Sequence, residues 1–186
     1  MKSQRVFLYV FDGYADWEPA LAIAGLQRWT ACEVQTFADD KKPIRSMGNL
    51  HVIPDFSIDE LNTASIDLLM LPGGDRWEKG GGNKIKSLTA SLVKQEKNIA
   101  AMCAATVFLA REGWLDHSEH TSNTLPYLQG LAPDYKGEDW YINKPAVSGR
   151  HIITANGTAM KEFAAEIFRA TDPENANLKK WFSYFS

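Results

Sequence analysis

Cys103 combines a reactive side chain with surroundings that could activate it. It lies between the apolar run of residues 99–102, which predicts a buried strand, and a helical pattern that begins at Ala104. The unpaired N–H groups and the positive dipole at a helix start favour the thiolate over the thiol, so the pKa of this cysteine is predicted to be lowered. The alternative is a small-residue helix start that is packed only for its shape. From this segment alone the two interpretations carry equal weight.

Backbone N–H groups that could hold a developing oxyanion are predicted beside this cysteine. A turn from strand into helix places the N–H of the following residue, Ala104, close to the sulfur. Gly73 and Gly74 follow another predicted strand, and glycine lets the backbone approach a reacting group closely. These three residues, together with Asn123, are therefore predicted to bind the substrate or its oxyanion.

Two other side chains are candidates for moving a proton. Glu18 falls in the first turn of a predicted helix, where a glutamate is also ordinary compensation of the helix dipole. If it faces Cys103 in a closed pocket, it could hydrogen-bond the thiolate or act as a general acid and base. Of the four histidines, His120 is the best catalytic candidate, although a lone histidine is more often structural.

Cys32, the second of the two cysteines, is predicted to be a small core residue. It enters a short β-like run with no glycine turn and no helix start beside it. The two cysteines are far apart, with no Cys-x-x-Cys spacing and no paired histidines nearby, so neither a disulfide framework nor a structural zinc site is expected. We expect neither a metal nor a cofactor.

The elements that must position these residues alternate between apolar runs and helical patterns. This alternation indicates β–α units on a mainly parallel sheet. Ligands of such sheets gather outside the carboxyl ends of the strands, so the segments 12–18, 72–75 and 103–106 are predicted to form one pocket. Strands are predicted at residues 5–11, 33–38, 66–71, 99–102 and 152–154, and helices at 17–29, 83–95, 104–111 and after Thr158.

Less regular patterns fill the remaining segments. A hairpin is predicted over residues 45–54 around a Gly48–Asn49 turn, and short strands are predicted near residues 120–123 and 146–148. Asp16 is a predicted N-cap for the helix at 17–29.

Composition narrows the class of protein. With 186 residues and 45% hydrophobic content, the chain 1–186 is expected to form one domain. The net charge of -3, without basic runs, makes nucleic acid an unexpected partner. The first residues fit neither a signal peptide nor a membrane span, so the expected location is the cytoplasm.

The sequence around these junctions resembles the DJ-1/PfpI family, within the class I glutamine amidotransferase-like group. The resemblance implies a flavodoxin-like three-layer α/β/α sandwich with a mainly parallel central sheet. It also implies that Cys103 is the elbow nucleophile, that Glu18 is the acid that hydrogen-bonds it, that Gly74 and Ala104 are oxyanion donors, and that the protein is a homodimer. It is carried by residues 10–13 and 17–19 (VFDG and WEP), 67–74 (DLLMLPGG), 100–106 (AAMCAAT) and 153–164 (ITANGTAMKEFA).

Two departures from the family pattern bear on the reaction. Protease-type members carry a histidine directly after the cysteine, where this chain has Ala104. Other members place a histidine where this chain has Asn123, and a slip of one turn in the alignment would bring His120 to that position. Because peptide or glutamine amide hydrolysis needs a proton delivered to a poor leaving group, these activities are disfavoured.

The predicted function is a cysteine-dependent enzyme of this family that acts on a small electrophilic carbonyl compound or adduct, in the manner of a glyoxalase, deglycase or hydrolase. Its partner is then a small-molecule substrate. The alternative is a redox sensor or stress-response protein in which Cys103 is oxidised to a sulfinic acid that Glu18 stabilises. A degenerate member retained as a partner-binding scaffold is a third possibility, and an intracellular protease, amidase or glutamine amidotransferase is less favoured.

Overall fold

A seven-stranded sheet forms the centre of the protein in the computed structural model, which describes residues 3–185. The strand order is β5-β2-β1-β6-β7-β9-β8. All neighbouring pairs of this sheet are parallel except β8 and β9. The strands are β1 (Arg5–Tyr9), β2 (Glu33–Ala38), β5 (Phe56–Ser57), β6 (Leu68–Leu71), β7 (Asn98–Met102), β8 (Ala146–Ser148) and β9 (Ile152–Ala155).

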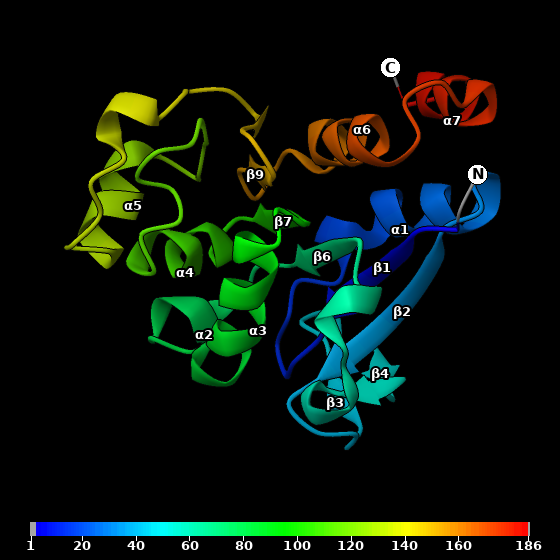
Figure 1. The fold of residues 1–186 in the computed structure, drawn as a ribbon, viewed down its shortest axis with the longest axis horizontal. Coiled ribbons are helices and arrows are strands. Elements are labelled where there is room, and N and C mark those ends of the chain that lie inside the picture. Colours follow the sequence, from blue (N-terminus) through cyan, green and yellow to red (C-terminus); the bar gives the residue numbers. More distant parts are fainter. Residues whose placement is uncertain (1–2, 186) are drawn as a thin grey trace.

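Helices cover both faces of this sheet, as Figure 1 shows. Helices α1 (Trp17–Trp29), α6 (Met160–Thr171) and α7 (Ala176–Ser183) pack together on one face. The other face carries α2 (Asp75–Glu78), α3 (Asn83–Lys94), α4 (Ala105–Arg111) and α5 (Leu125–Leu131). Because both faces are covered, the central strands β1, β6 and β7 are buried almost throughout and read as continuous apolar runs. The predicted three-layer sandwich with a mainly parallel sheet is confirmed.

The predicted hairpin is also confirmed, as a separate pair of antiparallel strands, β3 (Ile44–Arg45) and β4 (His51–Val52). Asp16 precedes α1 but makes no capping hydrogen bond. Its carboxylate instead accepts hydrogen bonds from the Ser46 hydroxyl at 2.9 Å and from the Gly48 N–H at 3.1 Å. Asp16 is therefore at the N-cap position as predicted, but its carboxylate ties the hairpin to the segment that leads to Glu18 and does not cap the helix.

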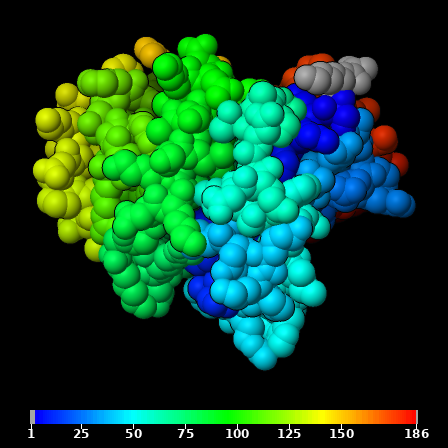
Figure 2. Space-filling model, turned by 60° about the horizontal axis from the view of Figure 1, so that its bottom comes forward, coloured from blue at the N-terminus to red at the C-terminus, as the bar shows by residue number. Residues whose placement is uncertain are grey.

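A hollow separates the hairpin from α2 on the surface shown in Figure 2, where the light-blue hairpin region and the green region of α2 and α3 form two projections. A cavity of about 430 Å³ lies there, between the hairpin residue Met47 and the α2 residues Asp75 and Arg76, with Asp12 and Gly13 at its base. The carboxyl end of β1 therefore opens to the surface beside the start of α2.

The segment between α4 and β8 departs most from the sequence prediction. The strand predicted near residues 120–123 is a single parallel bridge from His120 to Tyr141, and α5 was not predicted. A helix follows Thr158 as predicted and starts at Met160, with Ala159 at its N-cap position. Thr158 does not cap it, because its N–H and hydroxyl both donate to Asn156 Oδ1 in a turn. Short 3₁₀ helices complete the fold at Ile58–Glu60, Thr63–Ser65 and Glu138–Trp140.

Candidate functional site

Cys103 lies at a strained turn directly after β7. Its φ is 56°, in the left-handed region that residues other than glycine rarely adopt. The turn is held because the Cys103 N–H donates to the Ala155 carbonyl at 2.9 Å, and the Thr106 hydroxyl donates to the Cys103 carbonyl at 2.6 Å. A sharp strand-to-helix turn of this kind presents its side chain at the carboxyl end of the sheet, as in a nucleophile elbow.

Glu18 faces this cysteine from the first turn of α1. Glu18 is 1% exposed, and one of its carboxylate oxygens accepts the Gly73 N–H at 2.5 Å. Glu18 Oε1 and Cys103 Cβ both border Gly73. Burial raises the pKa of Glu18 to about 7, against the opposing effects of the Gly73 and Cys103 hydrogen bonds. A carboxyl group with such a pKa can give or accept a proton near neutral pH.

Burial also raises the pKa of Cys103, to about 11, with the negative charge of Glu18 as the second cause. The sequence predicted the opposite direction from the dipole of the following helix. That helix, α4, has only seven residues, and the N–H of Ala104 and the Asn123 amide lower the pKa less than burial and Glu18 raise it. The resting pair is therefore a thiol beside a buried carboxyl group.

Asn123 contributes a donor to the sulfur from the segment before α5. Its Nδ2 lies 3.4 Å from Cys103 Sγ, and its Oδ1 accepts the Gly157 N–H at 2.8 Å. Gly157 itself borders the sulfur, since a Cβ at this position would lie 2.8 Å from Cys103 Sγ. The loop between β9 and α6 thus forms a backbone wall of the site.

The glycines after β6 approach the cysteine closely enough to exclude side chains. A Cβ at Gly73 would lie 2.8 Å from Cys103 Cβ and 2.7 Å from Glu18 Oε1. Because the Gly73 N–H is bonded to Glu18, the predicted oxyanion donors that remain on this strand end and at the elbow are Gly74 and Ala104. Gly74 directly precedes α2 and has a φ of 146°, and Ala104 directly precedes α4.

His120 is fully buried, and both of its ring nitrogens have partners outside this group. Nδ1 lies 2.7 Å from the Ser118 carbonyl, and Nε2 lies 2.6 Å from the Tyr135 hydroxyl. Burial lowers the pKa of His120, which favours the neutral ring. The structure therefore brings Cys103, Glu18, Gly73 and Asn123 together. The ring of His120 is bonded instead to Ser118 and Tyr135.

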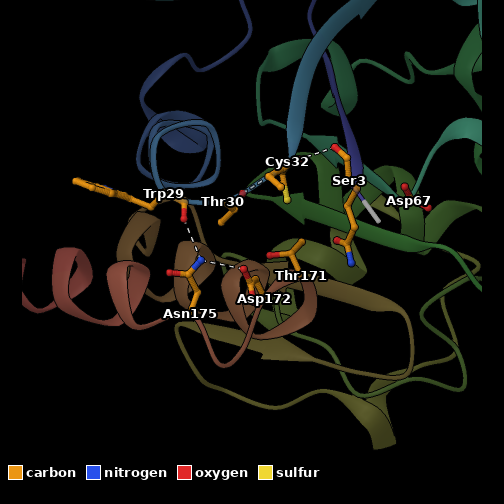
Figure 3. Close-up of a pocket in the computed structure, with 10 residues that line it drawn as sticks. Ser3, Trp29, Thr30, Cys32, Asp67, Thr171, Asp172 and Asn175 are labelled. Carbon is orange, nitrogen blue, oxygen red and sulfur yellow. Dashed lines mark hydrogen bonds between the residues drawn. The ribbon is translucent and has the colours of Figure 1, made fainter. Parts of the chain in front are cut away.

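Cys32 lies at the other end of the sheet, beside a cavity of about 550 Å³ that is shown in Figure 3. The lining residues Gln4, Cys32 and Asp67 directly precede β1, β2 and β6, whereas Cys103 directly follows β7. Cys32 is 8% exposed, and burial raises the pKa of its thiol. The cavity beside Cys32 is thus remote from the carboxyl ends of the strands.

Within residues 3–185, no group of three His, Cys, Asp or Glu side chains is arranged to hold a metal ion. No helix in that part of the chain has the length and apolar character needed to cross a bilayer.

Comparison with known proteins assigns the family. The family model described as "DJ-1/PfpI family" matches residues 4–170. The chain belongs to the DJ-1/PfpI family. A Bacillus subtilis relative named "Uncharacterized protease YoaZ" is 38% identical over 98% of this chain and 90% of its own length.

Solved structures of DJ-1/PfpI proteins have the same fold. The ThiJ/PfpI family protein from Bacillus anthracis superposes with a TM-score of 0.91 at 37% identity, covering 100% of this chain and 92% of its own. The DJ-1 superfamily protein Atu0886 from Agrobacterium tumefaciens gives 0.90 at 34% identity, covering 98% and 97%. The family resemblance predicted from the junction motifs is therefore confirmed.

Sequence reasoning missed one backbone wall and one side chain of this DJ-1/PfpI site. Asn156–Gly157 predicts a turn, but its approach to Cys103 depends on the pairing of β9 with β7. Tyr127 belongs to the unpredicted helix α5, and burial, Glu78 and the charge of Cys103 raise the pKa of its phenol. The signal for α5 is Thr124 before Pro126, an N-cap followed by a proline in the first turn.

Proposed function

We propose that the protein is a cysteine-dependent enzyme that acts on a small electrophilic carbonyl compound or a related adduct. Cys103 is the nucleophile and Glu18 moves the proton. The observation that carries this proposal is that a cysteine at a strained elbow and a buried carboxyl group whose pKa is about 7 both border Gly73. Such a pair can pass a proton between sulfur and carboxylate without a histidine.

The chemical step follows from where the protons reside. The Glu18 carboxylate accepts the S–H proton while sulfur attacks the carbonyl carbon. A C–S bond forms, and the π electrons of the C=O bond move to oxygen. In this proposal the N–H groups of Gly74 and Ala104 stabilise that oxygen. Protonated Glu18 then returns the proton to the oxygen, which gives a neutral thiohemiacetal adduct.

Peptide hydrolysis receives less support, although relatives carry the word protease in their names. An amine leaving group needs a proton from a positioned acid, and protease triads use a histidine for this. Ala104 follows the cysteine here, and the nitrogens of His120 are bonded to Ser118 and Tyr135.

Redox sensing is the second candidate function, because the same pair suits it. A sulfinic acid at Cys103 would place its oxygens against Glu18, whose raised pKa supplies a carboxyl O–H donor below about pH 7. Oxidation would need a peroxide as the oxidant, with Cys103 gaining two oxygen atoms.

Turnover of methylglyoxal and of simple esters and amides tests the proposal in wild type, Cys103→Ala and Glu18→Gln. Cys32→Ala is the matched control, since it removes the thiol that lies before β2 at the far end of the sheet. Turnover that is lost in Cys103→Ala and kept in Cys32→Ala supports the enzyme. If no substrate is turned over and mild peroxide adds two oxygen atoms to Cys103, the redox sensor would replace the enzyme as the proposed function.

A further inference from the structure

Two buried hydroxyl groups lie behind the turn that carries Cys103. Thr106, in the first turn of α4, is 0% exposed, and Ser122, before α5, is 2% exposed. Their hydroxyl oxygens lie 2.7 Å apart, and the Thr106 hydroxyl donates to the Cys103 carbonyl at 2.6 Å. A hydroxyl that is buried without a partner costs free energy, so each of these groups depends on its hydrogen bond. Neither has a role in the chemical step proposed above.

The direction of both hydrogen bonds is set by the acceptor at the end of this chain. The Cys103 carbonyl can only accept, so the single hydrogen of the Thr106 hydroxyl is used there. Ser122 must therefore donate its own hydroxyl hydrogen to Thr106 Oγ1. Accepting this bond polarises the Thr106 hydroxyl and strengthens it as a donor. The Thr106 N–H donates to the same carbonyl at 3.1 Å, so this carbonyl accepts two hydrogen bonds.

The same bonds fix the direction of the Ala104 N–H. The Cys103 carbonyl and the Ala104 N–H belong to one planar trans peptide unit, so the two groups point in opposite directions. Because the carbonyl points to the buried Thr106, the N–H points away from it. In the turns and loops of residues 3–185, no backbone carbonyl accepts the Ala104 N–H, which leaves this donor free for a ligand oxygen.

We propose that Thr106 and Ser122 are positioning residues, which hold the peptide unit between Cys103 and Ala104 so that the Ala104 N–H stabilises the oxygen of the bound carbonyl compound. The inference rests on the proposed function, in which Ala104 is an oxyanion donor. The left-handed φ of Cys103 supports it, because a strained residue persists only where its surroundings hold it in place. Rotation of this peptide unit would turn the N–H away from the oxyanion.

Turnover of methylglyoxal tests the two hydroxyl groups. Thr106→Val keeps the branched shape of the side chain and removes its hydroxyl. It should lower kcat about 10- to 100-fold with little change in KM, because an oxyanion donor acts in the transition state and here is displaced rather than removed. Ser122→Ala should lower kcat about 3- to 10-fold, the worth of one hydrogen bond. Thr106→Ser, which keeps the hydroxyl, should retain most of the wild-type rate.

Thr89→Val is the matched control for Thr106→Val. Thr89 is equally buried in α3, and its hydroxyl donates to the Ile85 carbonyl at 2.9 Å, so the variant loses the same kind of hydrogen bond. It should leave kcat unchanged. An unchanged kcat in Thr106→Val, or equal losses in Thr106→Val and Thr89→Val, would overturn the inference. If Ser122 acts through Thr106, Ser122→Ala should add nothing in a Thr106→Val background.

The titration of Cys103 gives a second readout. Burial and the charge of Glu18 raise the pKa of Cys103, whereas the Asn123 amide and the Ala104 N–H lower it. Tyr127 of α5 is the other titratable group that senses the sulfur, since burial raises the pKa of its phenol and the charge of Cys103 is a further cause. The hydroxyl variants leave Glu18, Asn123 and Tyr127 in place, so a changed titration reports on the Ala104 N–H.

The rate of Cys103 alkylation by iodoacetamide against pH measures this titration without a substrate. Thr106→Val should move the profile to higher pH and slow alkylation about 3- to 10-fold at a fixed pH on the rising limb. Thr89→Val should leave the profile in place. Unchanged or faster alkylation in Thr106→Val would overturn the inference. Failure of the proposed function would be recognised separately, as absence of turnover in wild type or as turnover that survives Cys103→Ala.

Discussion

A buried carboxyl group such as Glu18 costs stability when it ionises. Its pKa is 4.5 in an unstructured chain and about 7 in the folded protein, so the folded state binds this proton more tightly. The stability that results is fully present below pH 4.5 and is lost as the pH rises through 7. A shift of this size corresponds to about 3 kcal/mol, at about 1.4 kcal/mol for each pKa unit.

Glu18→Gln should therefore gain stability relative to wild type as the pH rises. The glutamine does not titrate, so the difference in the free energy of unfolding should move in its favour by about 3 kcal/mol between pH 4 and pH 8. Urea unfolding of both proteins at each pH measures this difference. Parallel pH dependence would mean that Glu18 is not the buried, proton-binding group described here.

His120 and Asn123 offer a second comparison of single residues. His120→Ala leaves a cavity and unpartnered groups at Ser118 and Tyr135, so it should lower the free energy of unfolding by about 1–3 kcal/mol. Its effect on turnover should stay far below the 10²–10⁴-fold loss typical of a general base. Asn123→Ala should reduce turnover more than it reduces stability. Turnover kinetics and unfolding of both variants measure these effects. A large loss of turnover confined to His120→Ala would show that His120 is catalytic.

The backbone approaches Cys103 closely at two glycines, Gly73 and Gly157. Gly157→Ala would place a methyl group 2.8 Å from Cys103 Sγ, and Gly73→Ala would place one 2.8 Å from Cys103 Cβ. Each should cost about 1–3 kcal/mol of stability through overpacking and reduce turnover at least about tenfold. Gly130→Ala is the control, because its Cβ meets nothing within 4 Å, and it should gain up to about 1 kcal/mol in α5.

Thermal unfolding and turnover of the three glycine variants check this expectation. Full activity in Gly157→Ala would show that the loop between β9 and α6 is farther from the sulfur than described.

The elements differ in how far the sequence predicts them. The buried strands β1, β6 and β7 and the helices α1 and α3 follow from apolar runs and helical periodicity, which are local signals. The segment before α5 does not, because Thr121 and Ser122 are buried polar residues whose partners lie far away in sequence. The Thr121 N–H, for example, donates to the Thr154 hydroxyl oxygen, and the Thr121 hydroxyl donates to the Lys144 carbonyl.

The site shows the same division. The motifs around Glu18, Gly73 and Cys103 predict one pocket because the carboxyl ends of parallel strands share an edge. The raised pKa of Cys103 could not be predicted, since burial depends on the complete fold. Tyr127 also required the structure, because only the packing of α5 brings its phenol close enough for the charge of Cys103 to act on it, in addition to burial and Glu78.

We propose that the whole molecule is a homodimer, and exposed apolar side chains indicate where the subunits meet. Trp17, Met47, Leu50 and Ile53 are 45–72% exposed and lie on or beside the hairpin that Asp16 ties to α1. Exposed apolar groups gathered in one region are typical of an interface. Wild type should sediment as a dimer and Ile53→Glu as a monomer, whereas Trp140→Glu should stay dimeric. A monomeric wild type would contradict this assignment.

The dependence of turnover on pH in wild type and Glu18→Gln tests most directly whether Glu18 moves the Cys103 proton. In wild type, kcat/KM for the carbonyl substrate should rise through about pH 7, where Glu18 ionises. In Glu18→Gln that rise should disappear, and kcat/KM above it should fall about 10²–10⁴-fold. A variant that keeps both the rise near neutral pH and the wild-type rate would contradict the account.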